Sequence, residues 1–295
     1  MKQTPRMLGL AFLALCAIGA EASQTGALLP RPVLKTYSPE KMLEVLDTLD
    51  TRGEDVHNVV AQLRVVMHDA RRSRDVNLTG AYIGDRDGNL RLRLQYGEST
   101  ILDLSIRGDE AMLWLPRKQR CYKGKRAEIL ASSEAELALV ALAGNARDLF
   151  FPHGWSASAT DRTSMVDRER DVVCVYEARG EKRVFARKLW LNPAQPVVDK
   201  LDVLGPNGKT LGSLKYEDYR FPAAGREANS EAPKVPYPAR VRLANADATR
   251  GLDLEVDELF VNTELTPARF VIKLPEGQTV EDMGAVLRSG HKLWE

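Results

Sequence analysis

A period-two alternation of apolar and polar residues constrains the fold of this chain more than any other feature of its sequence. Residues 61–67, 90–95 and 102–106 each place an apolar side chain at every second position. This pattern is typical of antiparallel strands that bury one face. Turn-forming residues separate these stretches, as at 87–88 and 107–109, so the successive strands are expected to form hairpins.

The same pattern continues through the second half of the chain. A further hairpin is predicted at 110–115 and 120–124, and more strands at 171–178, 183–192, 197–204, 210–221, 239–245, 252–261 and 270–274. No long linker with a shift in composition divides these strands into two groups. We therefore predict a mainly β (α+β) fold with one strongly curved antiparallel sheet that is closed or capped by helices.

Two helices are predicted from capping residues and apolar spacing. The first begins with Ser38 as its N-cap and Pro39 at the first helical position, and it ends at Gly53. Its apolar face carries Met42, Val45, Leu46 and Leu49, at the spacing of one helical face.

The second predicted helix is apolar around most of its circumference. A capping box of Ser133 and Glu136 begins it, and Pro152 ends it. A helix of this kind is buried on more than one side or covers an apolar space. The lid candidates on it are Leu139, Leu142 and Phe150.

Residues 1–22 have the layout of a secretory signal peptide. Lys2 and Arg6 precede an apolar stretch at 7–20, which is followed by the small-residue motif Ala20-Glu21-Ala22. The apolar stretch is shorter than the roughly 20 residues that span a bilayer. We expect cleavage after Ala22 and a periplasmic location for the rest of the chain.

The three cysteines leave two questions open. Acylation of Cys16 would tether the protein to the outer membrane, but the Leu15 before it fits a lipobox poorly. Cys121 and Cys174 remain after cleavage, and in an oxidising compartment they can form one disulfide or stay as two buried thiols.

Charge and motifs exclude several classes of function. The chain has 42 Lys and Arg against 41 Asp and Glu, and without residues 1–22 the two signs balance. Such a neutral chain lacks the basic surface of nucleic-acid-binding proteins. It also lacks a nucleophile elbow, a glycine-rich phosphate loop and spacings typical of metal ligands. We therefore expect no enzymatic activity, no cofactor, no metal site and no nucleic-acid partner.

Several motifs, in their order and spacing, carry a resemblance to a known family. They are 86–92 (RDGNLRL), 108–115 (GDEAMLWL), 189–193 followed by 208–209 and 216–219, 238–243 (PARVRL) and 270–277. Together they resemble the LolA/LolB-like family of periplasmic and outer-membrane proteins that handle lipoproteins. The resemblance spans residues 38–283 and implies a single domain there, after a flexible lead at 23–37 and before a C-terminal tail at 284–295.

The resemblance implies that the curved antiparallel sheet forms an incomplete barrel, with helices as a lid over an apolar cavity. It also implies a carrier that binds lipoprotein acyl chains, or another lipid, for outer-membrane lipoprotein sorting, together with a membrane-anchored donor or acceptor protein. An arginine on an early strand controls the lid in such carriers. It corresponds here to Arg86, with Arg91 as the next candidate. The alternative is an envelope-stress sensor of the same fold that binds lipid or lipoprotein and a protein partner.

An apolar concave face closed by an apolar helix would by itself make a space for acyl chains, since each buried CH₂ contributes about 0.8 kcal/mol. The alternation does not say which face of the sheet is concave. The candidates for the cavity wall are Leu92, Leu94, Leu104, Met112 and Trp114.

Overall fold

The computed structural model describes residues 38–69, 74–131, 149–150, 162–167, 172–179, 182–192, 195–204, 208–222, 235–246, 251–289 and 293. The signal segment with Cys16, the lead at 23–37 and the lid candidates Leu139 and Leu142 lie outside these ranges. In the ranges themselves, no helix has both the length and the apolar character needed to cross a membrane.

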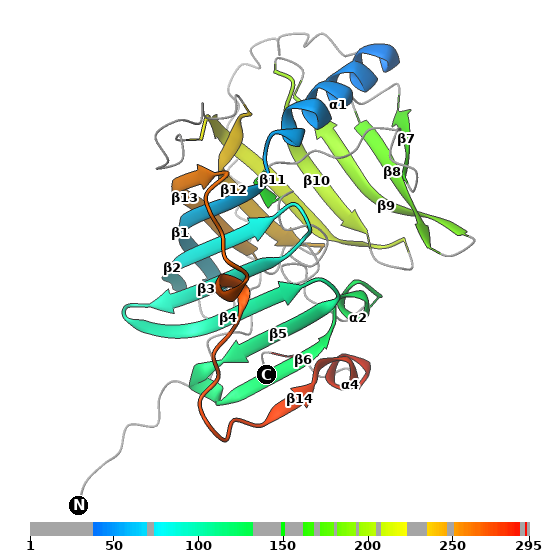
Figure 1. The fold of residues 1–295 in the computed structure, drawn as a ribbon. Helices are drawn as coiled ribbons and strands as arrows, with labels where there is room; N and C mark the ends of the chain where they lie inside the picture. The colour runs from blue at the N-terminus through cyan, green and yellow to red at the C-terminus, as the bar shows by residue number, and fades with distance from the viewer. Residues whose placement is uncertain are drawn as a thin grey trace, which may run out of the picture.

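One sheet dominates the described part of the chain and contains fourteen strands (Figure 1). The first six are β1 (Asn58–Asp69), β2 (Arg74–Asp85), β3 (Leu90–Tyr96), β4 (Ser99–Arg107), β5 (Glu110–Leu115) and β6 (Arg120–Lys125). The next seven are β7 (Arg162–Asp167), β8 (Val172–Arg179), β9 (Lys182–Leu191), β10 (Val198–Leu204), β11 (Thr210–Arg220), β12 (Tyr237–Asn245) and β13 (Gly251–Val261). The last strand is β14 (Val280–Asp282).

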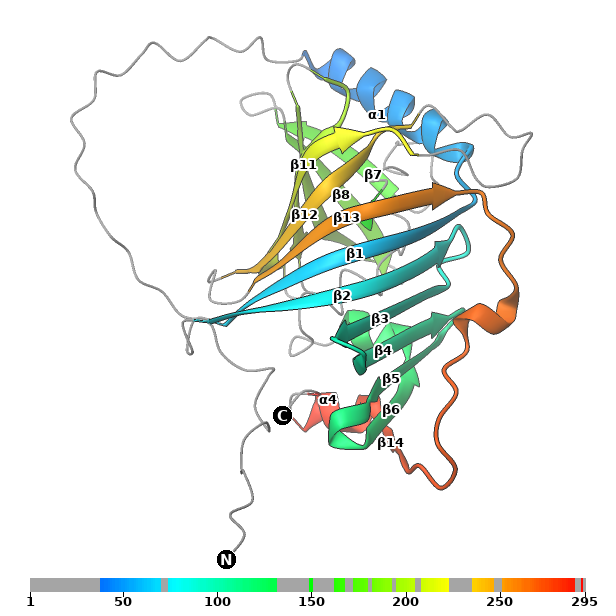
Figure 2. The same cartoon turned by 90° about the vertical axis from the view of Figure 1, so that its left-hand side faces the viewer.

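The sheet consists of two antiparallel meanders joined at their first and last strands. β1 to β6 pair in chain order, as do β7 to β13, and β1 pairs with β13 between them. The sheet is strongly curved and does not close (Figure 2). β14 adds to the free edge of β6 as a parallel strand, which requires the chain to cross over the sheet from β13. The predicted curved antiparallel sheet is confirmed.

Helices are few and short in these ranges. α1 (Pro39–Glu54) begins where predicted, because the Ser38 hydroxyl accepts a hydrogen bond of 3.3 Å from the Lys41 amide. α1 lies against β7 near one end of the sheet (Figure 1). The other helical elements are η1 (Pro116–Lys118), α2 (Arg126–Ala131), η3 (Pro267–Phe270) and α4 (Met283–Arg288). The sequence analysis predicted none of these four, nor β14.

The alternation predicted from the sequence sorts side chains onto two faces of the sheet. In β3, Leu90, Leu92 and Leu94 are buried, and the arginines between them point to the opposite side. We call the face with these leucines the inner face and the other the outer face. The inner face carries the main hydrophobic core, which also includes Val45 and Leu49 of α1.

The strand predicted at 270–274 does not exist. Phe270 is the last residue of η3, and residues 271–275 are irregular. They belong to a connection, residues 262–279, that we call the strap, which runs over the outer face from β13 to β14 (Figures 1 and 2). Phe270 and Ile272 are buried and Val271 is exposed, so this alternation arises from packing onto a sheet rather than from pairing within one.

Candidate functional site

The inner face presents continuous rows of apolar side chains across the strands. Residues paired across neighbouring strands point to the same face, so the register defines each row. One row crosses seven strands, from β13 through β1 to β6. It consists of Leu259, Ala61, Tyr82, Leu92, Leu104, Leu113 and Tyr122. Every member of this row is buried.

A second row extends the apolar surface over the other half of the sheet. It runs from β9 through β13 and β1 to β2 and consists of Leu189, Leu201, Leu214, Leu243, Leu252, Met67 and Val76. The rows share one face because Ala61 and Met67 lie an even number of residues apart in β1. Leu259 and Leu252 lie an odd number apart, and the register shift between β1 and β13 accounts for that difference.

Groups from outside the sheet cover this apolar surface. The ring of Phe150 packs edge-on against Tyr82, with 4.9 Å between the ring centroids and 74° between the planes. Such a pair adds about 0.5–1.5 kcal/mol beyond the burial of its area. Phe150 is fully buried, and Val45 and Leu49 of α1 join the same core. Phe150, the predicted lid residue that lies within the described ranges, thus packs on the inner face.

The predicted cavity wall divides between the two faces. Leu92 pairs with Leu104 on the inner face, and Leu94 lies beside them. Met112 and Trp114 lie on the outer face, because Leu113 between them is the residue that pairs with Leu104. The grouping of all five residues on one wall is therefore wrong. β5 is apolar on both faces since the strap covers its outer face, and its alternation could not indicate which side is inward.

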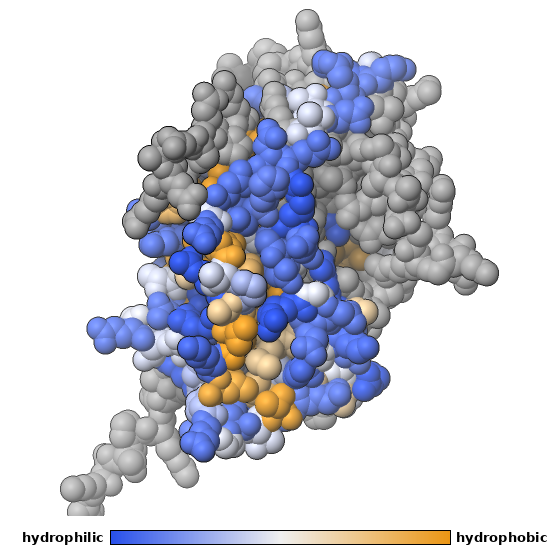
Figure 3. Space-filling view, in the orientation of Figure 1, coloured by the Kyte–Doolittle hydropathy of each residue, from blue (hydrophilic) through white to orange (hydrophobic). Residues whose placement is uncertain are grey.

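An outer cluster forms around the two misplaced residues. Trp114, Cys121 and Ile272 are buried together, with Met112 and Leu274 packed against them. Figure 3 shows an apolar strip on an otherwise hydrophilic outer face. Cys121 is a free thiol, and burial raises its pKa. Because Cys121 is free, the disulfide with Cys174 is not formed.

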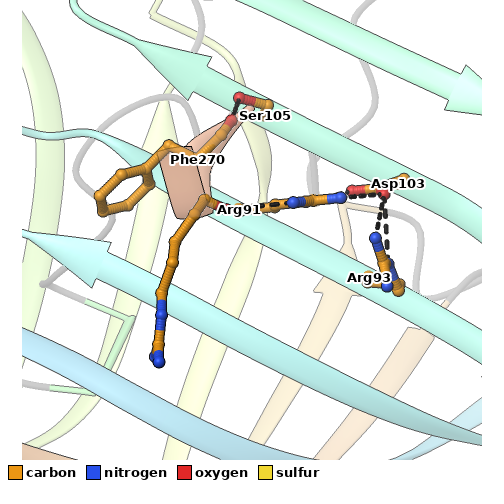
Figure 4. Close-up of polar contacts among 6 residues, drawn as sticks. Arg91, Arg93, Asp103, Ser105 and Phe270 are labelled. Carbon is orange, nitrogen blue, oxygen red and sulfur yellow. Dashed lines mark hydrogen bonds and ion pairs between the residues drawn. The ribbon is translucent and has the colours of Figure 1, made fainter. Parts of the chain in front are cut away.

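Beside the outer cluster lies a buried ion-pair network. The Asp103 carboxylate accepts hydrogen bonds of 2.9 and 2.7 Å from the Arg91 guanidinium and of 3.2 and 3.1 Å from that of Arg93 (Figure 4). The hydrogen bond to Asp103 raises the pKa of Arg91. Among the described residues, the buried polar side chains are Asp103 and Ser105, and both point to the outer face. The inner face therefore carries no buried charge in that part of the chain.

Arg86 and Arg91 occupy different places. Arg86 follows β2 on the surface, where its guanidinium donates to the carbonyl oxygen of Glu54, the last residue of α1. Its amide donates 2.8 Å to the carbonyl oxygen of His57. Arg86 thus contacts the end of the helix that covers the core. Arg91 lies under the strap and donates 3.1 Å to the carbonyl oxygen of Arg269.

Asp103 and Ser105 are functional candidates that sequence reasoning missed. They occupy the polar positions in the alternation of β4, which by itself does not distinguish a covered face from a solvent-exposed one. A signal was present, since Asp103 pairs with Arg93 and neighbours Arg91 across one hairpin. In the described ranges, no three His, Cys, Asp or Glu side chains gather in a way that could hold a metal ion.

Comparisons with known proteins bear on this geometry. No protein-family model matches the chain. "Zygote-specific protein 3" of Chlamydomonas reinhardtii is 26% identical over an alignment of 227 residues that covers 74% of this chain. The chain spans 57% of the length of that relative.

Two solved structures are similar to this chain. One is an outer membrane lipoprotein-sorting protein domain from Vibrio parahaemolyticus, with 14% identity, a TM-score of 0.52, and coverage of 79% of this chain and 97% of the domain. The other is LolA superfamily protein NE2245 from Nitrosomonas europaea, with 13% identity, a TM-score of 0.46, and coverage of 80% and 99%. At 14% identity the likeness to the Vibrio parahaemolyticus domain is one of fold, and it agrees with the LolA-like fold that the sequence motifs predict.

Proposed function

We propose that this protein binds lipid acyl chains against the inner face of its sheet and carries them in the periplasm, for the sorting of outer-membrane lipoproteins. The observation that supports this is the pair of apolar rows, which run without a buried charge from β9 to β6 in the described ranges. Acyl chains have no polar groups to satisfy, so a surface of this kind suits them better than a polar ligand.

Binding requires no covalent chemistry. Acyl chains would enter between the sheet and the groups that cover it, α1 with Leu149 and Phe150, and replace side-chain contacts that fill the core in the closed state. The chain would thus alternate between a closed state and a ligand-bound state in which the cover has moved. Arg86, which bonds to the last residue of α1, is positioned to influence that movement.

A chain-length series tests the proposal. The purified protein, without residues 1–22, is titrated with fluorescent fatty acids that differ by two methylenes. Each CH₂ buried contributes about 0.8 kcal/mol, so the Kd is expected to fall up to about fourfold per methylene until the site is full. An absence of saturable binding, together with the absence of lipid in protein purified gently from its native compartment, would refute the proposal.

A pair of matched variants locates the site on the inner face. Leu92→Phe adds volume to the first apolar row, whereas Val66→Phe adds it to the outer face of β1. The first variant is expected to weaken the binding of the longest fatty acid about tenfold and the second to leave it within about twofold. Equal effects of the two would place the bound chains elsewhere.

Recovery of one stable protein partner whose binding responds to lipid would support the sensor alternative.

A further inference from the structure

The strap connects the middle of the sheet to its outer edge. It leaves β13, and six strands separate β13 from β14 in the sheet order. Side chains hold the first two residues of the strap, 262–263, which we call its root. Asn262 accepts a hydrogen bond of 2.7 Å from the His57 amide and donates one of 2.7 Å to the carbonyl oxygen of Asp55. Asn58 donates 2.8 Å to the carbonyl oxygen of Thr263 and accepts 2.9 Å from its amide. The root is therefore bonded to the connection between α1 and β1.

The middle of the strap is seated on the outer face of β3 and β4. Arg91 donates to the carbonyl oxygen of Arg269, and the hydroxyl of Ser105 donates to that of Phe270 (Figure 4). Phe270 is 4% exposed and the next residue, Val271, is 37% exposed. Asp103 orients Arg91 for this contact, because its carboxylate holds the other nitrogens of the same guanidinium.

The far part of the strap covers the outer cluster and ends on the edge of the sheet. Ile272 packs over Trp114 and Cys121. The Gln278 amide group then donates 2.8 Å to the carbonyl oxygen of Gln119, just before β6. β14 follows, paired with β6. The strap is thus anchored at its root, at its end and in its middle. We call the middle site, where Arg91 and Ser105 hold the carbonyl groups of Arg269 and Phe270, the seat.

We propose that the strap is a clamp that holds the β3–β6 part of the sheet in its closed curvature and thereby controls access of acyl chains to the inner face. This proposal rests on the proposed function and names the element that regulates it. Strands β3 to β6 are packed on both faces, by the core inside and by the strap outside.

Packing on both faces resists a change of shape. Side chains packed between the sheet and the strap interdigitate at about the density of an organic crystal. The strap therefore fits the outer face of β3 and β4 at one curvature of the sheet. Entry of acyl chains displaces β3–β6 from the core and changes that curvature, which the seated strap opposes. The root carries the effect to the cover, because it bonds to Asp55 and His57, next to the end of α1.

The first experiment measures whether the seat holds the strap. Cys121 is 0% exposed beneath the strap and serves as the reporter in a Cys16→Ser, Cys174→Ser background. Phe270→Ala empties the seat but leaves Ile272 over the thiol. In this variant we expect the reaction of the Cys121 thiol with an aromatic disulfide reagent to accelerate about tenfold or more. Val271→Ala, on the exposed neighbour, is the matched control and should stay within about twofold.

A milder variant guards against general unfolding. Ser105→Ala removes the hydroxyl that donates to the Phe270 carbonyl oxygen and leaves the apolar contacts in place. It should accelerate the thiol reaction in the same direction by a smaller factor, with an unchanged circular dichroism spectrum. If both Phe270→Ala and Ser105→Ala react at the rate of the control, the seat does not hold the strap and the proposal is wrong.

The second experiment measures whether the strap controls binding. A fluorescent fatty acid is titrated into the chain with its natural strap and into the Phe270→Ala and Val271→Ala variants. Release of the clamp raises the population that can bind, so Phe270→Ala should lower the apparent Kd about fivefold or more. Binding that is equal in all three proteins overturns the clamp alone. An absence of binding in all three overturns the proposed function, whatever the thiol reaction shows.

Discussion

The charge network under the strap yields the sharpest stability prediction. The Asp103 side chain is 4% exposed and that of Arg91 is 15% exposed, whereas that of Arg93 is 43% exposed. Asp103→Leu fills the site with an apolar side chain but leaves the Arg91 guanidinium without its carboxylate partner. Arg93, in contrast, can turn toward water. The cost of the substitution is therefore the cost of one buried, unpaired guanidinium.

The size of this cost follows from the burial of Arg91. Removal of one member of a buried ion pair destabilises proteins by about 3–5 kcal/mol. The partial exposure of Arg91 places Asp103→Leu at the low end, at about 3 kcal/mol. For a domain of this size each kcal/mol corresponds to about 2–4 °C, so the Tm should fall by about 6–12 °C.

A double-mutant cycle separates the ion pair from other effects. Arg91→Met, Asp103→Leu and the two together are compared with the unchanged chain in urea and thermal unfolding. An apolar pair of similar volume commonly replaces a buried ion pair without loss. The double variant should thus be more stable than Asp103→Leu alone, with a coupling of about 1–3 kcal/mol. Additive effects, or a cost below about 1 kcal/mol for Asp103→Leu, would refute the reasoning.

Two further predictions concern the C-terminal helix and the response to alkali. Gly124→Ala places a Cβ 2.8 Å from that of Met283 in α4 and should cost about 1–3 kcal/mol in urea unfolding. Gly108→Asn should cost less, because the turn is open and asparagine tolerates its φ of 55° better than other side chains do. Burial raises the pKa of Tyr219 well above 10.0, so the folded state keeps a proton that the unfolded chain loses. Its contribution to stability is complete below about pH 10 and is lost as the pH rises toward the folded pKa. Tyr219→Phe should make the loss of Tm above pH 10 shallower, and exposed Tyr96→Phe should not; equal slopes would contradict this.

The sequence predicted most of the sheet because local rules decide it. A strand with one buried face must alternate, and β3 does so with Leu90, Leu92 and Leu94 on the inner face. The N-cap of α1 likewise depends on Ser38 and its near neighbours alone. The succession of strands without a dividing linker predicted one strongly curved sheet, and the resemblance to the LolA/LolB-like family agreed with it.

The tertiary structure alone decided the candidate site. A period of two defines two sets of side chains but does not say which set faces the core, and in β5 both sets are apolar. The pattern therefore groups Met112 and Trp114 with Leu92, Leu94 and Leu104, although they lie on the opposite face. The strap that covers them begins more than 140 residues later in the chain.

The separation in sequence between the strap and β4 also prevented a prediction of the polar residues that lie beneath the strap. Asp103 and Ser105 alternate with leucine and isoleucine as solvent-facing residues do, and no neighbouring residue in the sequence indicates that another segment covers them. Burial of Asp103 depends on two arginines across a hairpin and on a segment that crosses over from β13. Local pattern thus fixed which residues share a face, whereas long-range packing decided which face is inside and what lies over the other.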